Sequence, residues 1–292
     1  MRTLEYRVDE SRDGMEIGRF MQGKGYSRAM LTLLKQTDGL LVNGKSVRTI
    51  DRVSAGDVVS TVFDEISESV PNPELKAETV YEDDDIVVFD KPAGMPVHTS
   101  YRHYHDTLEN LFAARYPDCR FHAVSRLDRN TSGLIIAARH KFAAAVLMSD
   151  PEHRPEKLYY AVTGSGLAEK YGMSGEIIAP IAREKDSMIK RIVRDDGLYA
   201  HTRFRIIRTD GDICLSEVSL VTGRTHQIRV HFAYAGFPLL GDDLYGGDMS
   251  RISRQALHCG KTEFVHPVTN EKISLVSPLP DDISSIFPNK FT

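Results

Sequence analysis

Short apolar runs bounded by turn residues recur along this chain, and they restrict the fold more than any other feature of the sequence. The runs IVVF (86–89) and GLIIAA (133–138) have the length of buried strands. The turn pairs Asp210-Gly211 and Asn270-Glu271 each separate two further strand-like runs, which predicts two hairpins. Hairpin-connected strands with occasional helices predict an α+β fold with a largely antiparallel mixed sheet flanked by helices.

Helical spacing after residue 79 is found in three segments. These are TLENLFAARY (107–116), KFAAAVLM (141–148) and THQIRVHFAYAG (225–236). In the third segment we expect Thr225 to be the N-cap and Gly236 to end the helix.

The sequence pattern of the N-terminal part of the chain predicts a separate small α/β unit. Ser27 can cap a short helix, and Asn43-Gly44 joins two strand-like runs in a hairpin. The segment DEISESVPNPELKAE (64–78) is acidic and contains two prolines, as is typical of a linker. The predicted organisation is therefore a module over 1–63, a linker over 64–78 and a larger domain over 79–292.

Composition indicates a chain that works in a reducing compartment. Its N-terminus lacks the apolar core of a signal peptide, and no apolar stretch approaches the roughly 20 residues that span a bilayer. The three cysteines (Cys119, Cys214 and Cys259) are odd in number and far apart, which argues against a disulfide framework. We therefore expect a cytoplasmic protein with no membrane partner.

The net charge of −4 argues against non-specific coating of nucleic acid, but two segments, 19–52 and 183–208, are locally basic. This distribution favours a monomer that docks one basic face onto a polyanion.

Several enzyme classes have no counterpart in the sequence. There is no glycine-rich phosphate loop and no Gly-x-Ser-x-Gly elbow, so neither a nucleotide cofactor nor acyl transfer by such a serine is expected. The best metal candidate is the stretch HYHD, with His103, His105 and Asp106, but its His-x-His pair is a weak signal alone and matching further ligands are missing. We expect no metal and no cofactor, and keep a hydrolase using this cluster as an alternative.

The residues that remain for chemistry lie in three separate segments. Asp128 is flanked by Arg126 and Arg129, which would keep its carboxylate ionised. In KLYYAV (157–162), Lys157 and Tyr159 would share one face of a strand, and TGRTHQIRVH (222–231) supplies Arg224 and Arg229. On spacing alone, a surface ion-pair network is the more common interpretation of such a cluster.

These segments resemble, in order, the signature segments of the RluA family of pseudouridine synthases. The resemblance lies in RLDRNTSGL (126–134), KLYYAV, TGRTHQIRVHFAYAGFPLLGDDLYGG (222–247) and RQALHCGKTEFVHPVTNEK (254–272). YEDDDIVVFDKPAGMPVHTS (81–100) is similar to the family's opening strand and Lys-Pro-Ala-Gly turn, so the resemblance spans roughly 80–280. The N-terminal unit more weakly resembles a small RNA-binding module named after a ribosomal small-subunit protein. One departure is Ser125, where the family often has His before Arg-Leu-Asp.

The resemblance implies an RNA uridine isomerase that needs no cofactor. By the family pattern Asp128 is the nucleophile or base, Tyr159 stacks on the flipped uracil and could help to remove its C5 proton, and Arg229 pairs with Asp128. Arg126 would fill the space that the base vacates, and Arg129 and Arg224 would contact the RNA backbone. Lys157 would brace the site or touch phosphate. Leu134 and Ile228 are assigned to the core.

The resemblance also leaves the substrate open. An N-terminal RNA-binding module favours large-subunit rRNA, with tRNA as the alternative. A second hypothesis, from a different class, is a non-catalytic RNA-binding or ribosome-assembly protein that has kept the fold.

Overall fold

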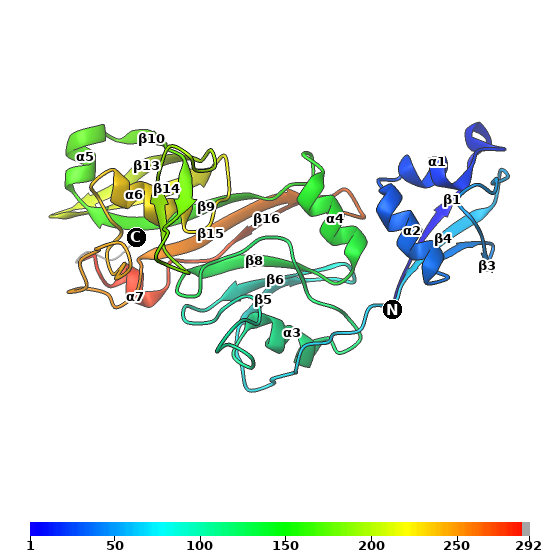
Figure 1. Ribbon diagram of the computed structural model, residues 1–292, viewed down its shortest axis with the longest axis horizontal. Coiled ribbons are helices and arrows are strands. Elements are labelled where there is room, and N and C mark those ends of the chain that lie inside the picture. The colour runs from blue at the N-terminus through cyan, green and yellow to red at the C-terminus, as the bar shows by residue number, and fades with distance from the viewer. Residues whose placement is uncertain (288–292) are drawn as a thin grey trace.

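The computed structural model describes residues 1–287 and contains a small and a large β-sheet (Figure 1). The small sheet is antiparallel and belongs to the N-terminal part of the chain. Across it the strands are β1 (Arg2–Arg7), β4 (Val58–Phe63), β2 (Leu40–Val42) and β3 (Lys45–Ser46). A 3-10 turn (Glu10–Arg12), α1 (Ile17–Gln22) and α2 (Arg28–Gln36) complete this unit.

Both local signals expected in the N-terminal unit are confirmed. The Ser27 hydroxyl accepts a hydrogen bond from the backbone N–H of Met30 and so caps α2. Asn43 and Gly44 have φ of 50° and 78°, the left-handed values that a two-residue hairpin turn between β2 and β3 requires.

The large sheet has ten strands and is antiparallel except where β15 pairs with β8. The order across it is β10 (Ser174–Ile178), β13 (His201–Asp210), β14 (Ile213–Leu220), β9 (Glu156–Gly164), β15 (Leu257–Val265), β8 (Ser132–Ala138), β6 (Ile86–Lys91) and β5 (Glu78–Glu82). β16 (Lys272–Val276) pairs with β15, and β7 (His122–Ala123) pairs with β8. The predicted α+β class with a largely antiparallel sheet is confirmed.

The predicted strands and hairpins are present with small shifts at their ends. IVVF and GLIIAA lie in β6 and β8, which are almost wholly buried. The turn between β13 and β14 is Gly211-Asp212, one residue later than expected, because Asp210 still pairs with Ile213. The β15–β16 hairpin includes Asn270 at φ 63°, as its turn position led us to expect.

Gly133 allows the single parallel pairing of the sheet. It has φ +108°, and a Cβ at this position would lie 2.3 Å from the carbonyl oxygen of Cys259 on β15. Only glycine permits this approach. The glycine of the Thr-Ser-Gly stretch therefore anchors the end of the Asp128 loop against the central strand β15.

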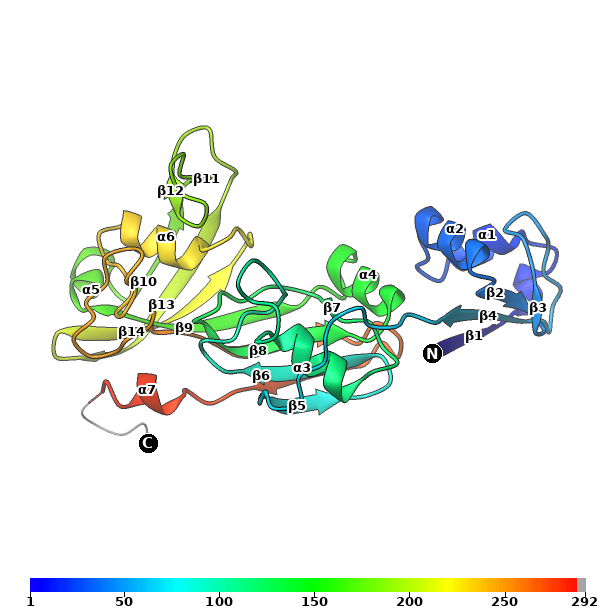
Figure 2. The same cartoon turned by 60° about the horizontal axis from the view of Figure 1, so that its bottom comes forward.

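Helices cover parts of the large sheet, and a hairpin projects from it. The helices are α3 (Leu108–Arg115), α4 (Lys141–Ser149), α5 (Gly166–Tyr171), α6 (Gln227–Tyr234) and α7 (Asp281–Ser284). The short strands β11 (Ile181–Arg183) and β12 (Arg191–Val193) form the projecting hairpin, which Figure 2 shows beyond α6. No helix within residues 1–287 is long and apolar enough to cross a membrane.

The expected cap of the third helical segment, Thr225, is wrong. Helix α6 begins at Gln227, and its N-cap is His226 in a left-handed conformation with φ 58°. The buried Gln227 side chain determines this start, because it accepts from the N–H of Arg224 at 2.9 Å and donates to the carbonyl of His201 at 3.0 Å. The helix ends at Tyr234, and Gly236 follows with φ +94°, as predicted for its stop.

The segment 64–78 lies along the larger part of the molecule. Glu65 contacts His122 at 2.7 Å and Lys141 at 3.0 Å. The N-terminal unit also contacts that part directly, through a 2.7 Å ion pair between Arg2 and Asp85 and through stacking of Tyr26 on Phe142. The two units therefore share a packed interface beside α4.

Candidate active site

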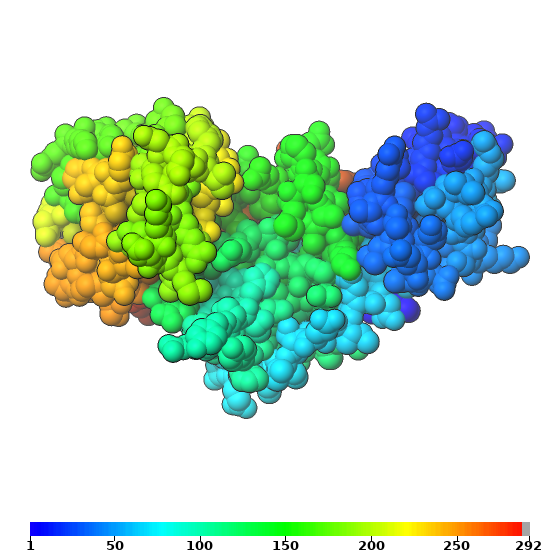
Figure 3. All heavy atoms as spheres, in the orientation of Figure 1, coloured from blue at the N-terminus to red at the C-terminus, as the bar shows by residue number. Residues whose placement is uncertain are grey.

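A cleft of about 1020 Å³ opens in the larger part of the molecule and brings three distant segments together. Its lining includes residues 123–128, 154–159 and 219–229. These are the loop after β7, the start of β9 and the stretch from the end of β14 into α6. Figure 3 shows this face hollowed between the lobe that carries α6 and the centre of the molecule.

Asp128 lies in the loop between β7 and β8 and is held from across the cleft by Arg229 of α6. Arg229 Nη1 donates to Asp128 Oδ2 at 3.0 Å. The other side of the same guanidinium makes two bonds, of 2.7 and 2.8 Å, to the fully buried carboxylate of Asp242. Burial alone would lower the pKa of Arg229, but the two carboxylates raise it above its usual value, so the guanidinium stays charged. Arg229, anchored by the buried Asp242, therefore orients the Asp128 carboxylate.

The backbone of the Asp128 loop is supported from below by Lys91, at the end of β6. Its side chain is fully buried, and its ammonium donates to the carbonyls of Pro92, Met95 and Arg129 at 2.8, 2.8 and 3.1 Å. Burial lowers the pKa of Lys91 to about 7, against the opposing effect of Asp128. The Lys-Pro-Ala-Gly turn thus fastens the loop that presents Asp128.

Replacing Lys91 with Met should lower the free energy of unfolding by about 2 kcal/mol, because buried carbonyls lose their donor. The Asp128 loop should also lose order, because the Arg129 carbonyl that Lys91 binds is adjacent to Asp128. Urea denaturation followed by circular dichroism measures the first effect. The exposed Lys45→Met variant is the matched control, and equal stability of the two variants would contradict the proposed support.

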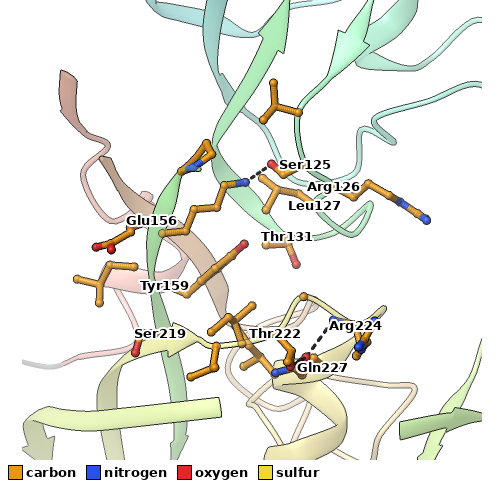
Figure 4. Close-up of a pocket in the computed structure, with 18 of the residues that line it drawn as sticks. Ser125, Arg126, Leu127, Thr131, Glu156, Tyr159, Ser219, Thr222, Arg224 and Gln227 are labelled. Atoms are coloured by element: carbon orange, nitrogen blue, oxygen red, sulfur yellow. Dashed lines mark hydrogen bonds between the residues drawn. The ribbon is translucent and has the colours of Figure 1, made fainter. Parts of the chain in front are cut away.

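Tyr159 and Lys157 point from one face of β9 toward the Asp128 loop. Tyr159 is buried beside Cys259, and this burial raises the pKa of its phenol well above the usual value, so it is protonated at neutral pH. The Lys157 ammonium donates to the Ser125 hydroxyl. Figure 4 shows Ser125 at one end of this contact and Tyr159 between it and the Thr222–Gln227 stretch. Serine at position 125 therefore acts as the partner of Lys157.

The remaining predicted arginines are exposed or near the surface. Arg126 and Arg224 line the cleft, and in Figure 4 the Arg126 side chain extends away from Tyr159. Arg224 Nε donates to the carbonyl of Tyr199 at 3.1 Å. Arg129 is exposed and, unlike the other predicted residues, does not line the cleft.

The cleft has a basic lining, which suits a polyanion. Its basic side chains are Arg126, Arg154, Lys157, Arg203, Arg224, Arg229 and Lys261, and its acidic ones are Asp128, Glu156 and Glu263. Although the whole chain is acidic, the charge at the cleft attracts phosphate.

Comparison with known proteins identifies the family. The family described as RNA pseudouridylate synthase matches residues 85–234, which include Asp128, Tyr159 and Arg229. This chain is an RNA pseudouridine synthase.

Relatives of this synthase cover nearly its whole length. The uncharacterized RNA pseudouridine synthase YjbO of Bacillus subtilis (strain 168) is 36% identical over 90% of this chain and 94% of its own. Ribosomal large subunit pseudouridine synthase D of Xanthomonas campestris is 33% identical over 89% of this chain and 84% of its own. The solved structure of human RNA pseudouridylate synthase domain containing 1 has the same fold, with a TM-score of 0.56 and 24% identity over 72% of this chain and 87% of its own.

Three residues of the synthase site are absent from the set of site residues predicted from the sequence. Asp242 and Tyr245 lie in the GDDLYGG stretch, and His226 precedes α6. Asp242 binds Arg229, while Tyr245 lies under the Arg229 guanidinium at 5.0 Å and bonds His226. All three lie in the longest segment that resembles the family, and this was the one signal that could have indicated them. Nothing in their spacing indicated that Asp242 and Tyr245 both contact Arg229.

His103, His105 and Asp106 are not among the groups of three close potential metal ligands within residues 1–287. His103 and Asp106 form a 2.7 Å pair near the surface of the synthase. Within residues 1–287, the group of three close potential ligands is instead Asp83, Asp85 and His266. In this group Asp85 already pairs with Arg2 and His140, and Asp83 pairs with His266.

Proposed function

We propose that this synthase isomerises uridines of large-subunit rRNA, with Asp128 as its essential catalytic residue. The observation that carries the proposal is the Asp128 carboxylate, held by the buried Arg229 beside Tyr159 in a basic cleft. The names of relatives, among them ribosomal large subunit pseudouridine synthases C and D, support the choice of RNA. On such a substrate the protein would act in the cytoplasm, and we propose that it does so as a monomer.

The reaction rearranges one nucleoside without adding or removing atoms. The bond between ribose C1′ and uracil N1 breaks, the base turns, and a bond from C5 to C1′ forms. The proton on C5 leaves and N1 gains one, so the balance needs no redox partner. Asp128 would attack the uracil, attack the ribose, or take a sugar proton, and each route requires its ionised form.

The neighbours of Asp128 have distinct proposed roles. Because the pKa of Tyr159 is raised by burial, its phenolate is scarce at neutral pH, and we assign the ring to stacking on the uracil. The Ser125 contact makes Lys157 a brace of the loop. A flipped base leaves a gap in its stack, which the exposed, planar Arg126 side chain would fill. Arg224 and Arg129 would contact the RNA backbone.

The substrate proposal predicts selective modification in vitro. We expect the purified protein to form pseudouridine at discrete positions of an unmodified large-subunit rRNA transcript, and to leave a pool of unmodified tRNA transcripts unchanged. Chemical mapping of pseudouridine by sequencing measures both, with the Asp128→Asn variant as the blank. Modification confined to tRNA would reject rRNA as the substrate. No modification of any RNA would favour a binding or assembly role instead.

A further inference from the structure

His226 has an unusual backbone conformation beside Asp128. Its φ of 58° is left-handed, which is uncommon for any residue other than glycine. This conformation turns the imidazole toward the cleft, whose lining it joins. Nδ1 lies 2.9 Å from Tyr245 Oη, and Nε2 lies 3.8 Å from Asp128 Oδ2. The ring therefore lies between the partly buried Tyr245, which it contacts, and the Asp128 carboxylate, which it faces.

The contacts of Tyr245 favour one position of the proton on the His226 ring. The backbone N–H of Arg191, on β12, donates to Tyr245 Oη at 3.0 Å. Since that bond uses an acceptor site of the oxygen, the phenolic O–H is free to donate to His226 Nδ1. Burial raises the pKa of Tyr245 to about 12, so this proton is retained. Burial also lowers the pKa of His226, with Asp128 opposing and Arg229 and Arg191 assisting, so the ring is neutral at neutral pH. Its proton is then on Nε2, the nitrogen that faces Asp128.

Arg229 and His226 both approach the same oxygen of the Asp128 carboxylate. Arg229 Nη1 binds Oδ2 at 3.0 Å, and His226 Nε2 is directed at Oδ2 as well. Within the described part of the chain, the side-chain contacts of Asp128 both end on Oδ2. Oδ1 is therefore the oxygen left to meet a nucleoside.

We propose that His226 is a positioning residue for the reaction: its tautomer is set by Tyr245, and its Nε2–H holds Asp128 Oδ2 so that Oδ1 faces the nucleoside. The proposal rests on the catalytic role proposed for Asp128. The observed 3.8 Å separation is longer than a hydrogen bond, so the proposal requires it to shorten when substrate fills the cleft, as contacts of catalytic groups commonly do.

The test uses variants that respect the backbone at position 226. Asparagine tolerates left-handed φ, so His226→Asn removes the Nε2 donor with little strain. His226→Gln places an amide N–H near the original Nε2 and should restore part of the activity. Tyr245→Phe keeps the ring under the Arg229 guanidinium and removes only the O–H. Tyr234→Phe, on the exposed end of α6, is the matched control.

We expect His226→Asn to lower kcat about 30-fold with KM within about two-fold of wild type, because a hydrogen bond to a charged group is lost. Tyr245→Phe should lower kcat about five-fold, and the double variant should be no slower than His226→Asn, since both changes remove one chain of contacts. His226→Gln should be at least about three-fold faster than His226→Asn. Steady-state pseudouridine formation on the RNA substrate supplies both constants.

Several outcomes would overturn the role of His226. These are a wild-type kcat in both single variants, an effect on KM alone, additive losses in the double variant, or no rescue by glutamine. If His226→Asn fails to fold, Tyr245→Phe decides by itself, because residue 226 is unchanged there. Activity retained by Asp128→Asn would instead reject the proposed role of Asp128, a separate result.

Discussion

The Asp128→Asn variant should lose at least about 10⁴-fold in kcat while its affinity for RNA stays within about two-fold of wild type. Asparagine has the size of aspartate but carries no negative charge, so none of the three proposed routes remains open. RNA affinity should persist because the basic side chains of the cleft are unchanged. Single-turnover pseudouridine formation and a filter-binding assay measure the two quantities.

The fold should survive this substitution. Arg229 keeps both of its bonds to the buried Asp242, so no buried charge is left without a partner. Asp84→Asn is the matched control, since Asp84 is exposed and makes only a 3.5 Å contact with Arg2. Activity of Asp128→Asn above about one hundredth of the Asp84→Asn rate would show that another group does the chemistry, and lost RNA binding would indicate a structural role for Asp128.

The Arg229→Gln variant should lose about 3–5 kcal/mol in the free energy of unfolding, as well as most of its activity. Glutamine leaves the fully buried Asp242 carboxylate without its cation, and an unpaired buried charge is among the most costly defects in a fold. Asp128 loses its orienting donor at the same time. Chemical denaturation and single-turnover kinetics on the same preparation measure both effects.

A surface arginine with the same kind of partner provides the control for this result. Arg251 makes two bonds to Asp212, of 2.9 and 2.8 Å, but both side chains are exposed to solvent. Arg251→Gln should therefore change the free energy of unfolding by less than about 1 kcal/mol. Equal free energies of unfolding for Arg229→Gln and Arg251→Gln would contradict the inference that the buried Arg229–Asp242 pair stabilises the fold.

Local patterns were sufficient to predict most of the elements. Ser27 could be recognised as a cap, Asn43-Gly44 as a hairpin turn and Gly236 as a helix end, because each depends on groups a few residues away. The start of α6 was misplaced at Thr225 for the opposite reason. It is determined by Gln227, whose side chain bonds to β13, more than 20 residues earlier in the chain.

The candidate site likewise has features that the sequence predicted and features that it could not predict. The sequence alone determined the fold class and, through its resemblance to a family, named Asp128, Tyr159 and Arg229. It could not show that Arg229 spans two carboxylates, because one lies 13 residues away and the other 101. The partner of Lys157 and the function of Lys91 under the loop also depend on contacts between distant segments.

Tertiary structure decided which atoms meet. Residue type and spacing report on hydrogen bonds and packing within an element, where the chain geometry is nearly constant. A site made by a loop, a strand and a helix from different parts of a sheet depends on how that sheet is ordered, and here on the parallel approach of β8 to β15 that Gly133 permits. The His226 ring likewise faces Asp128 because the backbone of His226 is left-handed and because the ring contacts Tyr245, 19 positions away. Such contacts exist only once the chain has folded.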